Sequence, residues 1–184
     1  MSVDGSKVMK QVAPTVTKVA VLTRVPPSAT VPRVASYENA LESGAKALGL
    51  LVRLWPLQGP DDIDRAFTAI VREGFRALDV PYVPVTWIHR RQILELAVRH
   101  RLPAIYSHRT YALDGGLMAY GEDEREVPQR LAVYLDKILR GAKPADLPIE
   151  QPTKFELVIN LKTAKALGLT IPPSLLLRAD QIID

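Results

Sequence analysis

Cysteine is absent from the 184 residues, which excludes disulfide bonds, thiolate nucleophiles and cysteine-ligated zinc. Aromatic residues make up only 6% of the chain, and no apolar run approaches the roughly 20 residues of a membrane span. The apolar fraction of 47% and the charged fraction of 24% are those of an ordinary globular protein. We therefore expect one packed domain, or slightly more, that is not inserted in a membrane.

The net positive charge of the chain comes entirely from its first 33 residues. Residues 1–33 carry five basic side chains and one acidic side chain, whereas the rest of the chain carries 19 of each. A nucleic-acid-binding protein would show a basic stripe with interleaved aromatic residues, or a recognisable reading motif. Neither pattern is present, so we expect no nucleic-acid partner.

Strand and helix patterns alternate over the first two thirds of the chain. Short apolar runs predict strands at 17–23, 50–54, 75–80 and 104–106. Apolar residues at helical spacing predict helices over 34–48, 61–73 and 87–101, the second capped by Asp61 or Asp62. This alternation is typical of βαβ units, so we predict an α/β fold: a three-layer, Rossmann-like lobe with a parallel sheet over 17–121.

The remaining residues, 122–184, have a different character. An amphipathic helix is predicted over 126–140, a proline-spaced linker over 143–152 and a half-buried strand over 155–161. Asn160 would cap a helix over 162–167, and Pro172 introduces a last short helix. These elements contain too few strands for a core of their own, so we expect a strand and helix tail.

Candidate binding residues follow from the predicted sheet, because open α/β sheets bind ligands where the loops after parallel strands converge. The loops 24–32, 81–86 and 106–110 meet at that edge. The hydroxyl side chains in these loops, which could instead cap helices or tie turns, are our predicted ligand contacts: Ser28, Thr30, Tyr82, Thr86, Tyr106 and Ser107. Such an edge suits a small anion, including a carboxylate.

Catalytic motifs are absent. The chain has no GxGxxG, GxxxxGK[ST], GxSxG or HExxH pattern, so we expect no catalytic residue, no cofactor and no metal site. His89 and His100 would share a helix face but lack a carboxylate at ligand spacing. An enzymatic alternative, a small Rossmann-like hydrolase or isomerase, would need an acid and base pair at the strand edge, and the sequence shows no obvious pair.

Four stretches resemble the substrate-binding proteins of ABC transporters, of the tryptophan and tyrosine type. They are GPDDIDRAF (59–67), RLPAIY (101–106), GGLMAYG (115–121) and the segment 132–180. The resemblance implies a type I periplasmic-binding-protein fold, of which this chain matches only the C-terminal portion. On this basis residues 1–16 are a remnant of a hinge helix, 17–121 the C-terminal lobe, and 122–184 a tail that would return to a missing N-terminal lobe.

The resemblance also implies a function. The chain would be the solute-binding component of an ABC importer, or a truncated relative of one, that binds a small amino-acid-like or carboxylate ligand without catalysis. An ABC permease would be its partner, and the periplasm its compartment. The six hydroxyl residues correspond to the C-lobe wall of the family cleft. Because the start of the chain lacks the apolar centre of a secretory signal, the chain as written would stay in the cytoplasm.

Two apolar surfaces would lose their cover if the other lobe is missing. They are the helical stripe Val127, Leu131, Leu135 and Ile138, and the strand face Phe155, Leu157 and Ile159. Exposing such side chains is costly, so we expect a symmetric homodimer that hides them. The alternative function is therefore a cytoplasmic, dimeric sensing or interaction module derived from such a binding protein.

Overall fold

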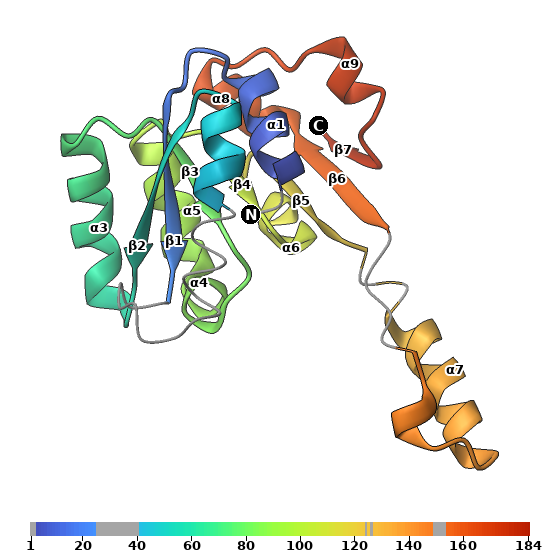
Figure 1. The fold of residues 1–184 in the computed structure, drawn as a ribbon. Coiled ribbons are helices and arrows are strands. Elements are labelled where there is room, and N and C mark those ends of the chain that lie inside the picture. Colours follow the sequence, from blue (N-terminus) through green and yellow to red (C-terminus); the bar gives the residue numbers. More distant parts are fainter. Residues whose placement is uncertain (1–2, 25–40, 124, 126, 149–153) are drawn as a thin grey trace.

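The described residues form one seven-stranded sheet in the order β2-β1-β3-β4-β5-β6-β7, with helices on both faces (Figure 1). The structure is a computed structural model, and it describes residues 3–24, 41–123, 125, 127–148 and 154–184. The strands are β1 (Lys18–Thr23), β2 (Leu51–Pro56), β3 (Ala77–Val80), β4 (Ala104–Tyr106), β5 (Met118–Glu122), β6 (Phe155–Asn160) and β7 (Gln181–Ile183). The helices are α1 (Val3–Val12), a helix over 41–47, α3 (Pro60–Arg72), α4 (Pro84–Ile88), α5 (Arg90–Arg99), α6 (Arg109–Leu113), α7 (Val127–Leu139), η2 (Pro144–Asp146), α8 (Leu161–Leu167) and α9 (Pro173–Leu176).

Neighbouring strands pair in parallel from β2 through β1, β3 and β4 to β5, and β6 also pairs in parallel with β7. The pair β5 and β6 is antiparallel, with the register running from Met118 opposite Ile159 to Glu122 opposite Phe155. The predicted α/β class, with a mostly parallel sheet, is confirmed.

Buried side chains alternate between the two faces of the sheet. In β1, Ala20 and Leu22 face one apolar cluster, whereas Val19 and Val21 face the other. The first cluster includes side chains of α3, α4, α5 and α6, and the second includes side chains of α1, the 41–47 helix, α8 and α9. Because both faces are covered, most residues of the central strands β1, β3 and β4 are buried and apolar, as is usual for parallel strands.

Two helix predictions need correction. The helix expected over 87–101 is two helices, because the chain leaves helical geometry at His89, which ends α4 and precedes α5. The apolar pattern over 87–101 also predicts that Ile88 and Val98 face inward, but both side chains are exposed. The cap of α3 is Gly59 without a side-chain hydrogen bond, and the Asp62 carboxylate accepts instead from the backbone N–H of Gln58 at 2.9 Å. Of the helix expected over 34–48, residues 34–40 lie outside the described residues.

The strand expected to reach for a missing lobe lies in this sheet. β6 pairs with β5, and Leu157 and Ile159 are buried in the cluster that contains α1. Asn160 caps α8 as expected, because its Oδ1 accepts from the N–H of Thr163, while its Nδ2 donates to the carbonyl of Ala112 in α6. This strand is buried because β6 continues the sheet beyond β5: Val158 packs in one apolar cluster, and Leu157 and Ile159 pack in the other.

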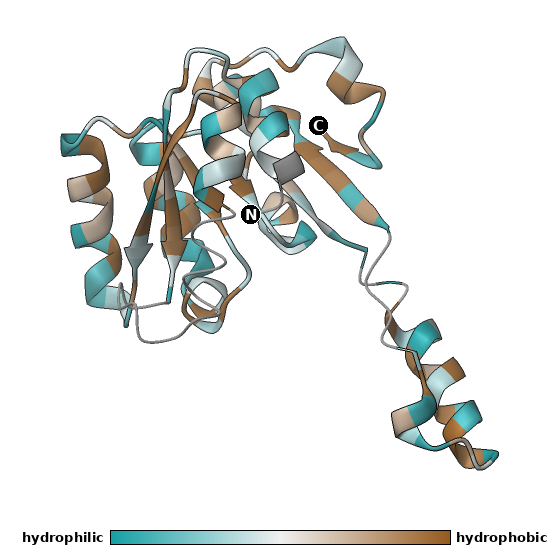
Figure 2. Ribbon diagram, in the orientation of Figure 1, coloured by the Kyte–Doolittle hydropathy of each residue, from teal (hydrophilic) through white to brown (hydrophobic). Residues whose placement is uncertain are grey.

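Helix α7 is the part of the tail that leaves the lobe. It projects away from the sheet together with η2 (Figure 1), and hydrophobic residues lie along it (Figure 2). The predicted stripe Val127, Leu131, Leu135 and Ile138 is between 39% and 57% exposed. In the part of the chain that is described, no helix combines the length and the apolar character that crossing a membrane requires.

One carboxyl group lies inside the lobe. Asp79 in β3 is only 2% exposed, between Val21 of β1 and Ile105 of β4. Its Oδ2 has no hydrogen-bond partner within the described ranges. Because burial disfavours the charged form, the pKa of Asp79 is raised to about 6.

Candidate functional site

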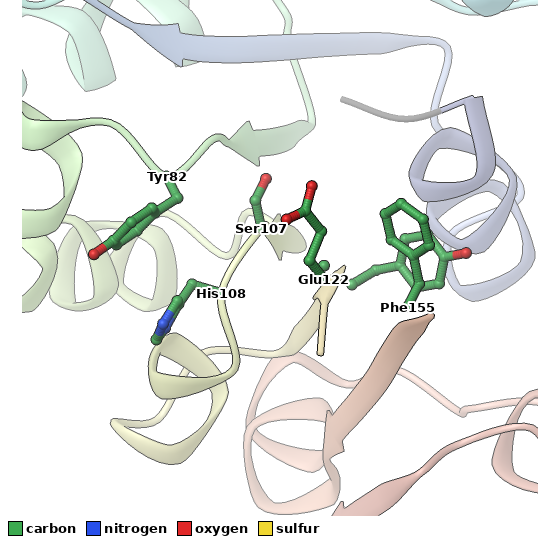
Figure 3. Close-up of a pocket in the computed structure, with 7 residues that line it drawn as sticks. Tyr82, Ser107, His108, Glu122 and Phe155 are labelled. Atoms are coloured by element: carbon green, nitrogen blue, oxygen red, sulfur yellow. The ribbon is translucent and has the colours of Figure 1, made fainter. Parts of the chain in front are cut away.

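A pocket of about 360 Å³ opens at the carboxyl edge of the sheet (Figure 3). Its lining comes from the loops after β3 and β4 and from the ends of β5 and β6: Tyr82, Ser107, His108, Tyr120, Gly121, Glu122 and Phe155. The last pair between β4 and β5 is Tyr106 with Ala119, so residues 120–122 extend past the end of β4. Paired with β6, this extension forms a second wall opposite the loops.

The loop wall is held by stacked rings. Tyr82 stacks on His108 with ring centroids 4.9 Å apart, and both rings contact the edge or face of Trp87 at 5.1 and 5.0 Å. His108 also caps α6, because its Nδ1 accepts from the N–H of Thr110 at 3.2 Å. Although Tyr82 is half exposed, these contacts fix its ring beside the pocket.

The strand wall carries a second aromatic pair and a carboxylate. Tyr120 and Phe155 stack with ring centroids 5.6 Å apart, and Glu122 lies opposite Phe155 in the register of β5 and β6. Figure 3 shows Tyr82 and His108 on one side, Phe155 on the other, and the carboxylate of Glu122 between them near Ser107. The pocket is therefore a polar gap between two aromatic surfaces.

Gly121 lets the two walls approach each other. A Cβ at this position would overlap the carbonyl oxygen of Ser107, and the Ser107 carbonyl carbon would lie 2.8 Å away. Ser107 is itself tied to β3, because its N–H donates to the carbonyl of Val80 at 3.2 Å. Both contacting groups are backbone, so neither can swing aside.

Replacing Gly121 with alanine should lower the free energy of unfolding by about 2 kcal/mol, because the added methyl forces the β5 strand away from the Ser107 loop. Urea denaturation would measure the loss. Gly59→Ala is the control, since nothing lies within 4 Å of its added Cβ, and its cap position makes us expect a change below about 1 kcal/mol. Equal effects of the two variants would contradict the close approach.

A buried ion cluster supports the far side of the strand wall. Asp123 accepts from Arg125 at 2.7 and 2.9 Å and lies 3.3 Å from the Lys154 ammonium. Glu156 lies 3.1 Å from Arg125 and 3.5 Å from Arg109, and Arg109 also donates to Gln181 in β7. The hydrogen bonds from Arg125 hold the pKa of Asp123 well below its usual range.

The predicted ligand residues fall into three groups. Tyr82 and Ser107 line the pocket. Thr86 and Tyr106 are fully buried beneath it: the Thr86 hydroxyl bonds within the turn that begins α4, at 2.6 Å to the carbonyl of Pro81, and Tyr106 stacks on Tyr111. Burial raises the pKa of both of these tyrosines. Ser28 and Thr30 lie outside the described residues.

The other lining residues were not among the predicted contacts. His108 lies in the predicted loop 106–110, but only hydroxyl side chains were predicted as contacts, and histidine has none. Tyr120, Gly121, Glu122 and Phe155 come together through antiparallel pairing of distant segments, for which the local sequence gives no signal. In the described part of the chain, no three histidine or acidic side chains gather in a way that could hold a metal ion.

Comparison with known proteins places this fold and site in context. A structure of an ABC domain from Streptococcus pneumonia in complex with L-Trp superposes with a TM-score of 0.84 at 24% identity, covering 98% of this chain and 60% of that one. A conserved domain protein from Vibrio cholerae gives a TM-score of 0.84 at 21% identity, over 98% of this chain and 59% of its own. These likenesses show a shared fold.

Of two further relatives, one has a lower sequence identity and the other aligns with only part of this chain. A ligand-free, open substrate binding protein with adhesive properties from Clostridium difficile gives a TM-score of 0.70 at 19% identity, over 100% of this chain and 60% of that one. An uncharacterized protein of Rickettsia prowazekii is 33% identical over 63 residues, which are 34% of this chain and 21% of that protein. This chain thus spans about 60% of the length of the similar structures.

The family model for ABC transporter substrate binding proteins matches residues 4–183, nearly the whole chain. The family resemblance inferred from the sequence is confirmed by this match and by the shared fold. The chain therefore belongs to the family of ABC transporter substrate binding proteins.

Proposed function

We propose that this chain binds a small amino-acid-like or carboxylate-bearing solute for an ABC importer, without catalysis. The observation that carries the proposal is the pocket at the carboxyl edge of the sheet, in a chain of a solute-binding family. Tyr82 and Ser107 would contact the solute directly. Ser28 and Thr30, which follow β1 in the sequence but lie outside the described residues, are kept as proposed contacts from the sequence alone. Thr86 and Tyr106, being buried, would support the wall from below.

The pocket has two walls from this chain but an open side. Solutes in binding proteins of two lobes are buried when the lobes close, and this chain matches about 60% of such structures. We propose that this lobe binds its solute with a dissociation constant of roughly millimolar. A second lobe or a second copy would supply the opposite surface and tighten binding.

Titration calorimetry of the protein with the twenty amino acids and simple carboxylates would test this function. We expect one solute class to bind, and Tyr82→Ala to weaken that binding about tenfold, because the ring forms the loop wall. Leu177→Ala, at an 89% exposed position of the α9 end, is the control and should bind normally. Absence of binding by any of these solutes, or unchanged binding by Tyr82→Ala, would refute the assignment.

We propose an ABC permease as the partner and the space outside the cytoplasmic membrane as the place of work, since that is where proteins of this family normally act. The alternative is a dimeric sensing or interaction module that stays in the cytoplasm. The exposed apolar stripe of α7 favours self-association in either case. Burying apolar surface contributes about 25 cal/mol per Å², and a two-fold axis would pair the stripe with itself.

Self-association through α7 predicts a mass above the 20.4 kDa of one chain in light scattering at micromolar concentration. Leu131→Glu should return the protein to a single chain, because it places a charge in the centre of the paired stripes. Ala132→Glu introduces the same charge outside the stripe and should remain associated. A monomeric mass for the unmodified protein would exclude the homodimer.

A further inference from the structure

The pocket carries one formal charge among its described lining residues, and that charge is negative. Glu122 is the only acidic or basic side chain of the lining apart from His108. The Nδ1 atom of His108 accepts a hydrogen bond from the N–H of Thr110, so this nitrogen is already engaged with the backbone. No printed hydrogen bond or ion pair engages the Glu122 carboxylate elsewhere in the described chain, and Figure 3 shows it facing the pocket.

Three basic side chains of the described residues near this edge of the sheet are engaged elsewhere. Arg109 follows His108 directly, but its guanidinium pairs with Glu156 and donates to Gln181 at 2.7 Å. Arg125 and Lys154 pair with the buried carboxylate of Asp123. None of these three side chains lines the pocket. A solute carboxylate would therefore meet Glu122 without a matching cation from the described walls.

Aromatic side chains line the pocket on both sides of the same carboxylate. The stacked pair of Tyr82 and His108 lies on the loop wall, and the stacked pair of Tyr120 and Phe155 lies on the strand wall. The faces of tyrosine and phenylalanine rings attract cations, and a carboxylate adds a charge-assisted hydrogen bond to any N–H group. Two aromatic pairs with a carboxylate between them therefore provide the groups that bind an ammonium ion.

Building on the proposed function, we propose that the head group recognised by this wall is an organic cation, an ammonium held by Glu122 between the two aromatic pairs. An amino-acid-like solute would present its amine here, and its carboxylate would be left to surfaces other than these walls. The solute class is thus amines and amino acids with a flat apolar portion, and simple carboxylates are excluded.

Matched ligands test the sign of the charge. Phenethylamine and 3-phenylpropionate share a ring and chain length but are a cation and an anion at pH 7. Trp87 contacts Tyr82 and His108 and is one of two tryptophans, so its fluorescence in a Trp55→Phe background reports binding at the loop wall. Calorimetry on the unmodified protein provides the same comparison without this substitution.

We expect phenethylamine to bind about tenfold more tightly than 3-phenylpropionate. Glu122→Gln should remove most of that preference, weakening the amine about fivefold and leaving the acid unchanged or improved, whereas Glu95→Gln on exposed α5 should leave both unchanged. Tighter binding of the acid, or an amine affinity that Glu122→Gln does not change, would overturn the cation site while supporting solute binding. If none of these ligands, the amino acids or the simple carboxylates binds, both the cation site and the proposed function are refuted.

Discussion

Asp79→Asn should raise the free energy of unfolding by about 2 to 3 kcal/mol at pH 7. The Asp79 carboxyl is enclosed between β1 and β4, and burial raises its pKa to about 6, against about 3.9 in an unfolded chain. The folded state therefore holds the proton more tightly than the unfolded state. The stability linked to this proton is complete below pH 4 and is lost as the pH rises through 6.

Asparagine keeps the shape of the side chain but cannot ionise, so the difference between variant and unmodified protein should be small at pH 4 and reach its full size above pH 6. Urea denaturation at the two pH values measures that difference. Asp184→Asn, at an exposed terminal position, should show no such pH dependence. A variant that is less stable at pH 7, or a difference that is equal at both pH values, would contradict this account.

Glu156→Ala should lower the free energy of unfolding by about 3 kcal/mol, because it removes the buried carboxylate that Arg109 and Arg125 share. The side chain of Glu156 is only 4% exposed, and that of Arg109 is 27% exposed, so water can replace the lost partner only in part. Added salt should reduce the loss only in part, since the pair with Arg109 is mostly buried whereas the side chain of Arg125 is 60% exposed.

Glu156→Gln separates charge from hydrogen bonding in this cluster. Its amide oxygen still accepts from one arginine, so we expect roughly half of the loss caused by alanine. Glu95→Ala on the surface of α5 should stay within about 0.5 kcal/mol of the unmodified protein. Guanidinium would screen the ion pairs, so urea is the denaturant of choice. A loss for Glu156→Ala as small as the Glu95 control would show that the cluster contributes nothing.

The lobe could be predicted from the sequence because each of its elements has a strong local pattern. Val19 to Leu22 in β1 and Ile63, Phe67 and Ile70 in α3 are buried as their spacing predicts. The break at His89 could not be predicted, since the helical spacing on its two sides continues without a glycine or an internal proline. Local periodicity identifies a helix but does not reveal where its axis turns.

The pocket was harder to predict than the fold for the same reason. The loop residues Tyr82 and Ser107 follow parallel strands, and the strand rule places them at the correct edge. Glu122 and Phe155 are 33 positions apart in the chain and meet only because β5 and β6 pair antiparallel. Thr86 and Tyr106 show the opposite error, since a hydroxyl group at the edge can equally serve the turn beneath it.

The antiparallel pairing of β5 and β6 places the two ends of the segment that contains α7 side by side. The N–H of Asp123 donates to the carbonyl of Lys154 at 3.1 Å, so these two residues are neighbours across the ladder. A two-residue Asn-Gly turn between them would replace 124–153 with an ordinary β-hairpin and keep all seven strands. We expect the lobe to fold without residues 124–153, although it would lose the ion pairs of Arg125, and this smaller protein would allow the pocket to be altered separately from α7.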